Sequence, residues 1–148
     1  MFLNGRVFVI LLVGGEKGGS GKSCLAQNIA VCLQQVGRNV MLIDADPQAT
    51  TADWAAERGQ NDELSTLPCV QASGNIRKTI SDLAKHYESL VIDVGGQDSE
   101  ALRSAMSIAT HLLLPFRPKR RDLKTLSQVE NLVKLAVAIN PELKVRAI

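Results

Sequence analysis

Residues 6–23 of the chain read RVFVILLVGGEKGGSGKS, and this stretch decides the fold. Its first part, Arg6 to Val13, is nearly all apolar and rich in β-branched residues, which predicts a strand buried on both faces. A glycine-rich turn, Gly14 to Gly21, follows it. The pattern then predicts a helix from Lys22 to Val36, ended by Gly37. The apolar positions that we expect on one side of this helix are Leu25, Ile29, Cys32, Leu33 and Val36.

Apolar runs and amphipathic stretches continue to alternate along the chain, with turn residues between them. Further strands are expected at 39–43, 67–71, 90–94, 111–116 and 144–148. Helices are expected at 51–58, 75–87, 99–109 and 122–139. This alternation of buried-type strands with helices predicts an α/β fold with an open, mainly parallel sheet flanked by helices on both faces. No repeat or linker divides the chain, so residues 1–148 are expected to form a single domain.

Length and composition exclude several classes of protein. The chain has 148 residues, of which 45% are hydrophobic and 22% charged, and this composition excludes disordered and collagen-like proteins. No apolar run reaches the roughly 18 residues of a membrane helix, and no cleavage site for a signal peptide follows the first strand. The three cysteines are odd in number and far apart, which favours a reducing compartment. We therefore expect a cytoplasmic protein.

Charge is divided unevenly along the chain. From Pro115 to the end there are eight Lys or Arg and three acidic residues, a net charge of +5, whereas the rest of the chain carries −3. Such a division favours a surface in the last quarter that meets a polyanion, although a solvated basic face produces the same pattern.

Three loops are expected to converge at one edge of the sheet. The turn Gly14 to Gly21, the segment Asp44 to Asp46 and the segment Asp93 to Gly96 each follow a predicted strand. Because ligands in open parallel sheets bind beyond the carboxyl ends of the strands, these loops predict a binding site.

The segment Lys17-Gly18-Gly19-Ser20-Gly21-Lys22-Ser23 has the features of a phosphate-binding loop. Glycines let successive backbone N–H groups approach a phosphate chain, and the start of the next helix adds partial positive charge. Lys22 can reach the β- and γ-phosphates, and the Ser23 hydroxyl can bind Mg²⁺. The alternative is a plain glycine-rich turn. The predicted nucleotide-binding residues are Gly18, Gly19, Ser20, Gly21, Lys22, Ser23 and Cys24.

This loop departs from the general phosphate-loop pattern, since Glu16 stands where that pattern has glycine, and Lys17 begins the loop. The arrangement resembles the deviant Walker A motif of the ParA/MinD family of partition and positioning ATPases. Asp44-Ala45-Asp46-Pro47-Gln48 resembles the second motif of that family, and the strand that ends at Asp93 resembles its Walker B strand. The match covers nearly the whole chain and is closest to the small plasmid-partition ParA proteins, which implies a three-layer P-loop NTPase domain.

The resemblance implies roles for individual residues. Lys22 would contact phosphates in its own subunit, and Lys17 would reach the nucleotide of the partner in an ATP-dependent homodimer. Asp46 would orient the attacking water, whereas Ser23, Asp44 and Asp93 would surround Mg²⁺. Lys17 as a solvated loop residue and Asp46-Pro47 as a simple turn remain the alternatives. Val94-Gly95-Gly96 departs from the family, which often has a proline-containing turn there.

The resemblance also implies partners. ParA-type proteins hydrolyse ATP, bind DNA without sequence preference and act with a centromere-binding adaptor of the ParB type in plasmid or chromosome segregation. Here Lys119, Arg120 and Arg121 are the expected DNA contacts, in a cytoplasmic protein that associates with the nucleoid. A solvated charged loop explains these residues equally well.

Other functions remain as alternatives. They are a MinD-like positioning ATPase, a metabolic ATP-dependent ligase and a hydrolysis-poor nucleotide-binding protein. No amphipathic membrane-binding helix closes the chain, and Lys17 argues against the ligase. Family members usually continue beyond this length, so we expect a domain shortened at its C-terminal end.

Cys24 and Cys32 are expected in the core, and the spacing of the cysteines does not favour a metal or iron–sulfur site.

Overall fold

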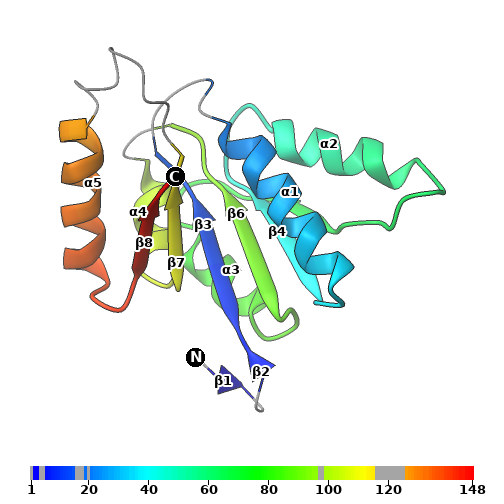
Figure 1. Ribbon diagram of the computed structural model, residues 1–148, viewed down its shortest axis with the longest axis horizontal. Coiled ribbons are helices and arrows are strands. Elements are labelled where there is room, and N and C mark those ends of the chain that lie inside the picture. The colour runs from blue at the N-terminus through cyan, green and yellow to red at the C-terminus, as the bar shows by residue number, and fades with distance from the viewer. Residues whose placement is uncertain (1, 4–5, 16–18, 20, 97–98, 116–125) are drawn as a thin grey trace.

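The computed structural model describes residues 2–3, 6–15, 19, 21–96, 99–115 and 126–148 (Figure 1). Six parallel strands form the main sheet in the order β5-β4-β6-β3-β7-β8. In chain order they are β3 (Val9–Val13), β4 (Val40–Asp44), β5 (Cys69–Gln71), β6 (Ser89–Asp93), β7 (His111–Leu114) and β8 (Lys144–Ala147). The helices are α1 (Lys22–Gln35), α2 (Thr50–Gly59), α3 (Arg77–Leu83), α4 (Glu100–Met106) and α5 (Leu126–Ile139).

Helices cover both faces of this sheet, as the alternation of elements predicts. The side chains of β3 point alternately to the two faces: Leu11 and Val13 pack in one hydrophobic cluster with α1, whereas Ile10 and Leu12 pack in another with α3, α4 and α5. In Figure 1, α1 lies in front of the strands and α3 and α4 lie behind them. Every residue of β4 and of β6 is buried, which explains their nearly continuous apolar sequences. The three-layer α/β architecture is confirmed.

The N-terminal strand differs from the prediction. Instead of one strand from Arg6 to Val13, a short strand β2 (Arg6–Val7) pairs antiparallel with β1 (Phe2–Leu3) as a separate small sheet. The central strand begins only at Val9. An apolar run shows how much of a segment could be buried, but not where the pairing partner changes, which explains the error.

The packing face of α1 also differs from the prediction. Cys24 and Cys32 are exposed, and Val36 is 75% exposed. The fully buried positions of the helix are Ala26 and Ala30, flanked by half-buried Leu25, Ile29 and Leu33. Alanines four residues apart lie on one helical face, and their small side chains let α1 pack closely on the sheet. Cys32 falls on the opposite side from Ala30, and Val36 follows the last residue of the helix.

The remaining elements lie where they are predicted, with ends shifted by a few residues. The largest change is in the helix expected at 75–87, which the structure restricts to α3, Arg77–Leu83. The first turn of the helix expected at 122–139, residues 122–125, lies outside the described residues. Among the residues described, no helix is both long and apolar enough to cross a membrane.

Candidate functional site

The glycine-rich turn connects β3, a central strand, to the start of α1. Within it Gly19 and Gly21 have positive φ angles of 73° and 85°, a conformation that residues with a Cβ rarely adopt. Gly21 is also the residue at the N-cap of α1, where it has no side chain to cap the first N–H groups of the helix. At this N-cap, no side chain of the described residues caps the helix, so the first N–H groups of α1 are suited to binding an anion. Lys17, Gly18 and Ser20 lie outside the described residues.

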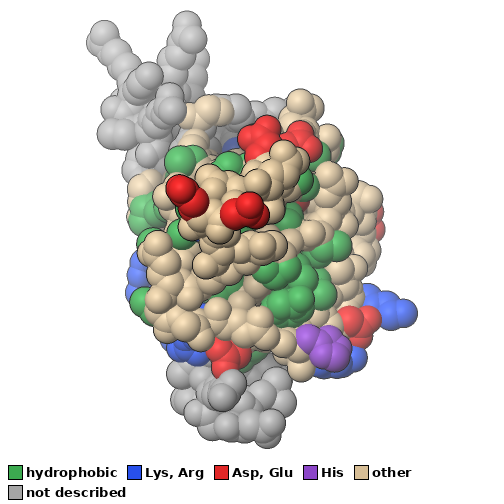
Figure 2. Space-filling view, turned by 90° about the vertical axis from the view of Figure 1, so that its right-hand side faces the viewer, with side chains coloured by type: hydrophobic (Ala, Val, Ile, Leu, Met, Phe, Trp, Pro, Cys, Tyr) green, Lys and Arg blue, Asp and Glu red, His purple; other side chains and the backbone are tan. Residues whose placement is uncertain are grey.

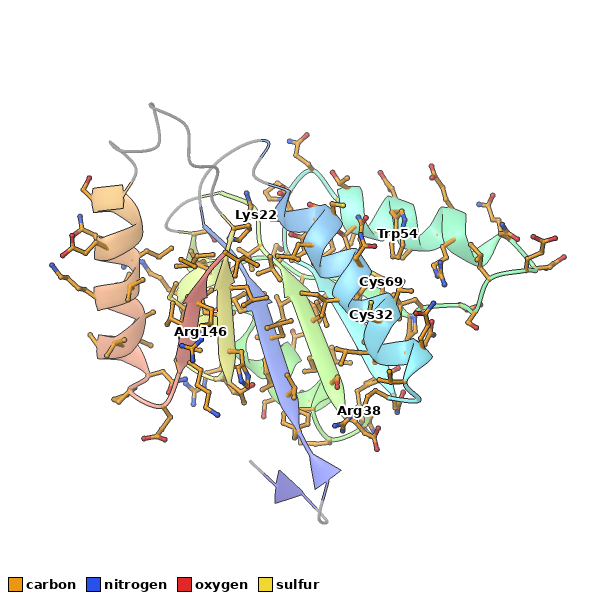
Figure 3. All side chains as sticks on the ribbon, in the orientation of Figure 1. Lys22, Cys32, Arg38, Trp54, Cys69 and Arg146 are labelled. Atoms are coloured by element: carbon orange, nitrogen blue, oxygen red, sulfur yellow. The ribbon has the colours of Figure 1, made fainter. Side chains whose placement is uncertain are left out.

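Lys22 occupies the first position of α1 and is only 8% exposed. It lies at the carboxyl edge of the sheet, beside the ends of the central strands (Figure 3). An ammonium group is seldom buried without a polar environment, so a solvated lysine on a loop does not describe this residue. Ser23, the next residue, is half-buried, and Cys24 is exposed.

Asp44 and Asp93 lie side by side at the carboxyl ends of neighbouring strands. Their Cα atoms are partners in the register of β4 and β6, and both side chains are buried, with 1% and 0% exposed. Asp44 uses both oxygens on backbone groups: Oδ1 accepts from the N–H of Asp46 at 3.0 Å and Oδ2 from that of Ala52 at 2.7 Å. Asp44 therefore holds the Asp46 loop and the first turn of α2 against the sheet.

Asp46, two residues after Asp44, is half-buried. Its Oδ1 accepts a hydrogen bond from the N–H of Gln48 at 2.9 Å, which is the side-chain turn expected for Asp before proline. At the same time its carboxyl group lies directly against Gly95, where an added Cβ would overlap it. The turn thus directs the Asp46 side chain toward the segment after β6. Forming a turn therefore does not exclude a functional role for Asp46.

Asp93 is less fully hydrogen-bonded than Asp44. Its Oδ2 accepts a hydrogen bond of 2.6 Å from the Thr51 hydroxyl, while its Oδ1 has no hydrogen-bond partner among the described residues. Burial raises its pKa, the hydroxyl groups of Thr51 and Ser23 lower it, and the Asp44 and Asp46 carboxylates raise it further. The net shift is upward. A buried, partly unsatisfied carboxylate beside a binding loop is typical of a functional site.

Two polar residues of the site carry no signal in the sequence. Thr51 is completely buried, and its hydroxyl accepts a hydrogen bond of 3.1 Å from Nε2 of Gln27 while donating to Asp93. Gln27 lies on α1 and Thr51 on α2, and the Thr51–Asp93 contact spans 42 residues of sequence. No local pattern marks such a long-range contact.

The oxygen atoms that this site offers suit a Mg²⁺ ion that keeps several water ligands, rather than an ion bound entirely by protein side chains. Within the described part of the chain, no group of three or more His, Cys, Asp and Glu could hold a metal ion. Mg²⁺ commonly uses one or two protein ligands, with water and phosphate oxygens completing its octahedron. The Ser23 hydroxyl and the free Oδ1 of Asp93 suit that role. Cys69 does not, because burial and then the Asp44 carboxylate raise the pKa of its thiol to about 11.

The predicted DNA contacts Lys119, Arg120 and Arg121 lie outside the described residues. Farther along the same basic quarter of the chain, Lys144 and Arg146 of β8 are exposed. The face that carries α2 is different: exposed Asp53, Glu57, Asp62 and Glu63 occur on α2 and the loop after it. Figure 2 shows acidic side chains on that side of the molecule, in its upper part.

The contact between Gly95 and Asp46 can be tested by adding one methyl group. Gly95→Ala should force the Asp46 carboxyl from its place and lower the free energy of unfolding by about 1–3 kcal/mol, as overpacking does. Urea unfolding measures the loss, and a crystal structure locates Asp46. Gly59→Ala is the matched control, because a Cβ there meets nothing within 4 Å. A Gly95→Ala protein with unchanged stability and an unmoved Asp46 would contradict the contact.

The buried charge of Asp93 should oppose folding at neutral pH. Because its pKa is higher in the folded state than in the unfolded chain, the ionised form is disfavoured by folding, and this cost disappears as the pH falls through the folded-state pKa. Asp93→Asn should therefore raise the free energy of unfolding at pH 7 by about 1 kcal/mol, as substitutions at strained functional sites often do. The gain should shrink at lower pH. Exposed Asp82 provides the control as Asp82→Asn, and a loss of stability in Asp93→Asn would refute the argument.

Comparison with known proteins agrees with this geometry. Residues 11–145 match the family model described as the CobQ/CobB/MinD/ParA nucleotide binding domain. Protein ParA of Rhizobium radiobacter is 31% identical over 113 residues, which cover 76% of this chain and 50% of that protein. Maintenance of carboxysome distribution protein A of Halothiobacillus neapolitanus is 29% identical over 136 residues, covering 90% of this chain and 62% of that protein.

Among solved structures, cobyrinic acid a,c-diamide synthase of Mycobacterium smegmatis, with a bound ATP analogue and magnesium, superposes with a TM-score of 0.81. The superposition covers 96% of this chain and 74% of that one, but only 17% of the residues are identical, so it establishes the fold alone. The chain spans about half to three-fifths of the length of the two sequence relatives. It belongs to the CobQ/CobB/MinD/ParA nucleotide-binding domain family.

Proposed function

We propose that this chain is an ATP-binding, Mg²⁺-dependent ATPase of the ParA type, which dimerises with ATP and acts in DNA partition. The observation that carries the proposal is the placement of buried Lys22 and of buried Asp93, whose Oδ1 has no partner among the described residues, at the same edge of the sheet as a glycine turn. A cation, a carboxylate and uncapped N–H groups at one place are the parts that phosphoryl transfer uses.

Each residue has a distinct part in this proposal. The N–H groups from Gly18 to Cys24 bind the phosphate chain, and Lys22 neutralises its outer phosphates. Ser23 and Asp93 hold Mg²⁺, which supplies charge neutralisation of the β- and γ-phosphates. Asp44 supports the metal site from the second strand and fixes the Asp46 loop through its two backbone hydrogen bonds.

Asp46 and Lys17 have the parts that concern hydrolysis. Asp46 orients the attacking water, for which its place against Gly95, above the end of β6, is suitable. Lys17 would enter the site of the partner subunit, where it would stabilise negative charge that develops in the transition state. Hydrolysis then requires a dimer, and assembly and turnover are coupled.

A partition role is favoured over a metabolic ligase by the sequence relatives. The relative at 31% identity bears the name ParA, whereas the diamide synthase is similar only in fold at 17% identity. A positioning ATPase with another cargo is the second candidate, because the carboxysome-distribution relative matches 90% of the chain. A centromere-binding adaptor of the ParB type is the proposed partner in the first case, with the protein on the nucleoid.

Substitution of the two lysines separates binding from turnover. Lys22→Ala should abolish ATP binding measured by calorimetry, because the phosphates lose their buried cation. Lys17→Ala should bind ATP with nearly unchanged affinity but fail to dimerise or hydrolyse it, as sedimentation and phosphate release would report. Lys85→Ala is the control, since Lys85 is an exposed lysine paired with Asp82 on the surface.

Two results would count against these assignments. Unchanged ATP affinity in Lys22→Ala would remove the phosphate loop from the proposal. A Lys17→Ala protein that dimerises and hydrolyses ATP normally would leave Lys17 as a solvated loop residue and the in-trans role without support.

DNA binding should depend on ATP and on salt. With ATP but not ADP, the protein should bind duplex DNA of arbitrary sequence, more weakly as salt rises, because basic side chains displace counterions. Replacing Lys119, Arg120 and Arg121 together by Ala should lower the slope of log affinity against log salt by about three. The control replaces exposed Lys78 on α3 and exposed Lys85, just after that helix. Fluorescence anisotropy measures both, and absence of binding at low salt would favour the positioning ATPase.

A further inference from the structure

One buried hydroxyl joins three elements of the site. Thr51 belongs to α2, its hydroxyl donates to Oδ2 of Asp93 at the end of β6, and it accepts from Nε2 of Gln27 on α1. Gln27 lies one helical turn after Ser23, so the second bond comes from the same helix that carries the phosphate loop. With none of its surface exposed, Thr51 is shielded from water that could replace either bond.

The donors and acceptors of this junction allow one arrangement. A hydroxyl group has a single proton, and an ionised carboxylate can only accept. The Thr51 proton therefore goes to Asp93, and the Gln27 amide must present its NH₂ group, which supplies a donor to the hydroxyl oxygen. The bond to Asp93 is short, at 2.6 Å, as hydrogen bonds from hydroxyls to charged acceptors are.

This junction leaves the two oxygens of Asp93 in different environments. Oδ2 is committed to Thr51, and Oδ1 has no partner within the described residues although it is fully buried. A buried carboxylate oxygen without a partner is costly in the absence of a ligand. Because the bond to Thr51 restrains rotation of the Asp93 carboxyl group, Oδ1 keeps a fixed direction.

We propose that Thr51 is a positioning residue for Mg²⁺: by holding one oxygen of Asp93, it presents the other to the ion that Ser23 and the nucleotide phosphates would share. The inference rests on the proposed function, since it concerns the same site. It adds a residue that touches neither nucleotide nor metal and whose contribution is orientation.

The helix turn that contains Thr51 also holds the Asp46 loop in place. The N–H of the next residue, Ala52, donates to Asp44, and Asp44 also holds the N–H of Asp46. The first turn of α2 is thus bound to both buried carboxylates, through Thr51 to one and through Ala52 to the other. The placement of Asp93 and of the water-orienting loop therefore depends on the same helix turn.

The test compares variants that differ in one hydroxyl. Thr51→Val keeps the branched shape and removes the donor, Thr51→Ser keeps the donor, and Thr50→Val makes the same change at the exposed neighbouring residue. ATP affinity is measured by calorimetry over a range of Mg²⁺ concentrations and in EDTA. We expect the Mg²⁺ concentration that gives half of the increase in ATP affinity to be about tenfold higher for Thr51→Val than for the wild type. The ATP affinity measured in EDTA should be unchanged. Thr51→Ser and Thr50→Val should behave as the wild type.

The outcomes separate this inference from the proposed function. If the wild type binds ATP with Mg²⁺ and Thr51→Val has an unchanged Mg²⁺ requirement, or Thr51→Ser is equally impaired, the positioning role is overturned while the ATPase proposal stands. If the wild type binds no ATP, both are overturned. Should Thr51→Val fail to fold, Thr51→Cys against Thr51→Ser makes the same comparison, with the weak thiol donor expected to be the impaired member.

A second readout needs no nucleotide. In a double-mutant cycle, Thr51→Val and Asp93→Ala should change the unfolding midpoint non-additively, because each removes the same hydrogen bond. Additive shifts would show that the two side chains do not interact in solution and would overturn the inference.

Discussion

The placement of two carboxylates in register at the ends of adjacent buried strands is the constraint on which the site depends. Asp44 and Asp93 are Cα partners of β4 and β6, and both are out of contact with water. Like charges so placed raise the free energy of the folded protein unless donors surround them. The chain meets this requirement unequally: two backbone N–H groups donate to the two oxygens of Asp44, whereas Thr51 donates to Oδ2 of Asp93 and its Oδ1 has no partner among the described residues. The unpaired Oδ1 of Asp93 is the feature on which the proposed Mg²⁺ site rests.

Much of this arrangement could be predicted from the sequence because its causes are local. The strand before the glycine turn, the lysine after it and the aspartates after two later strands are each recognisable from a few neighbouring residues. Parallel strands then bring their carboxyl ends to one edge, and convergence of the three loops follows from the α/β alternation alone. For the same reason the family resemblance could be drawn from three short motifs.

What escaped prediction depends on contacts between distant segments. Thr51 looks like an ordinary residue at a helix start until β6 is placed beside it, and Gly95 looks like a loop glycine until Asp46 is found against it. The packing face of α1 differs from the expectation for another reason. The hydrophobicity of Cys32 and Val36 predicts that they face the sheet. The structure instead places Ala26 and Ala30 against it, because their small side chains allow the helix to approach closely.

The lack of a side chain at Gly95 has a mechanical consequence. With the Asp46 carboxyl filling the space beside its Cα, the segment after β6 and the loop after β4 exclude one another and cannot both occupy the gap between them. A displacement of the peptide at Gly95 toward the loop must push Asp46 outward, and withdrawal of Asp46 opens room for that peptide. Steric contact alone thus makes the position of each segment limit the position of the other.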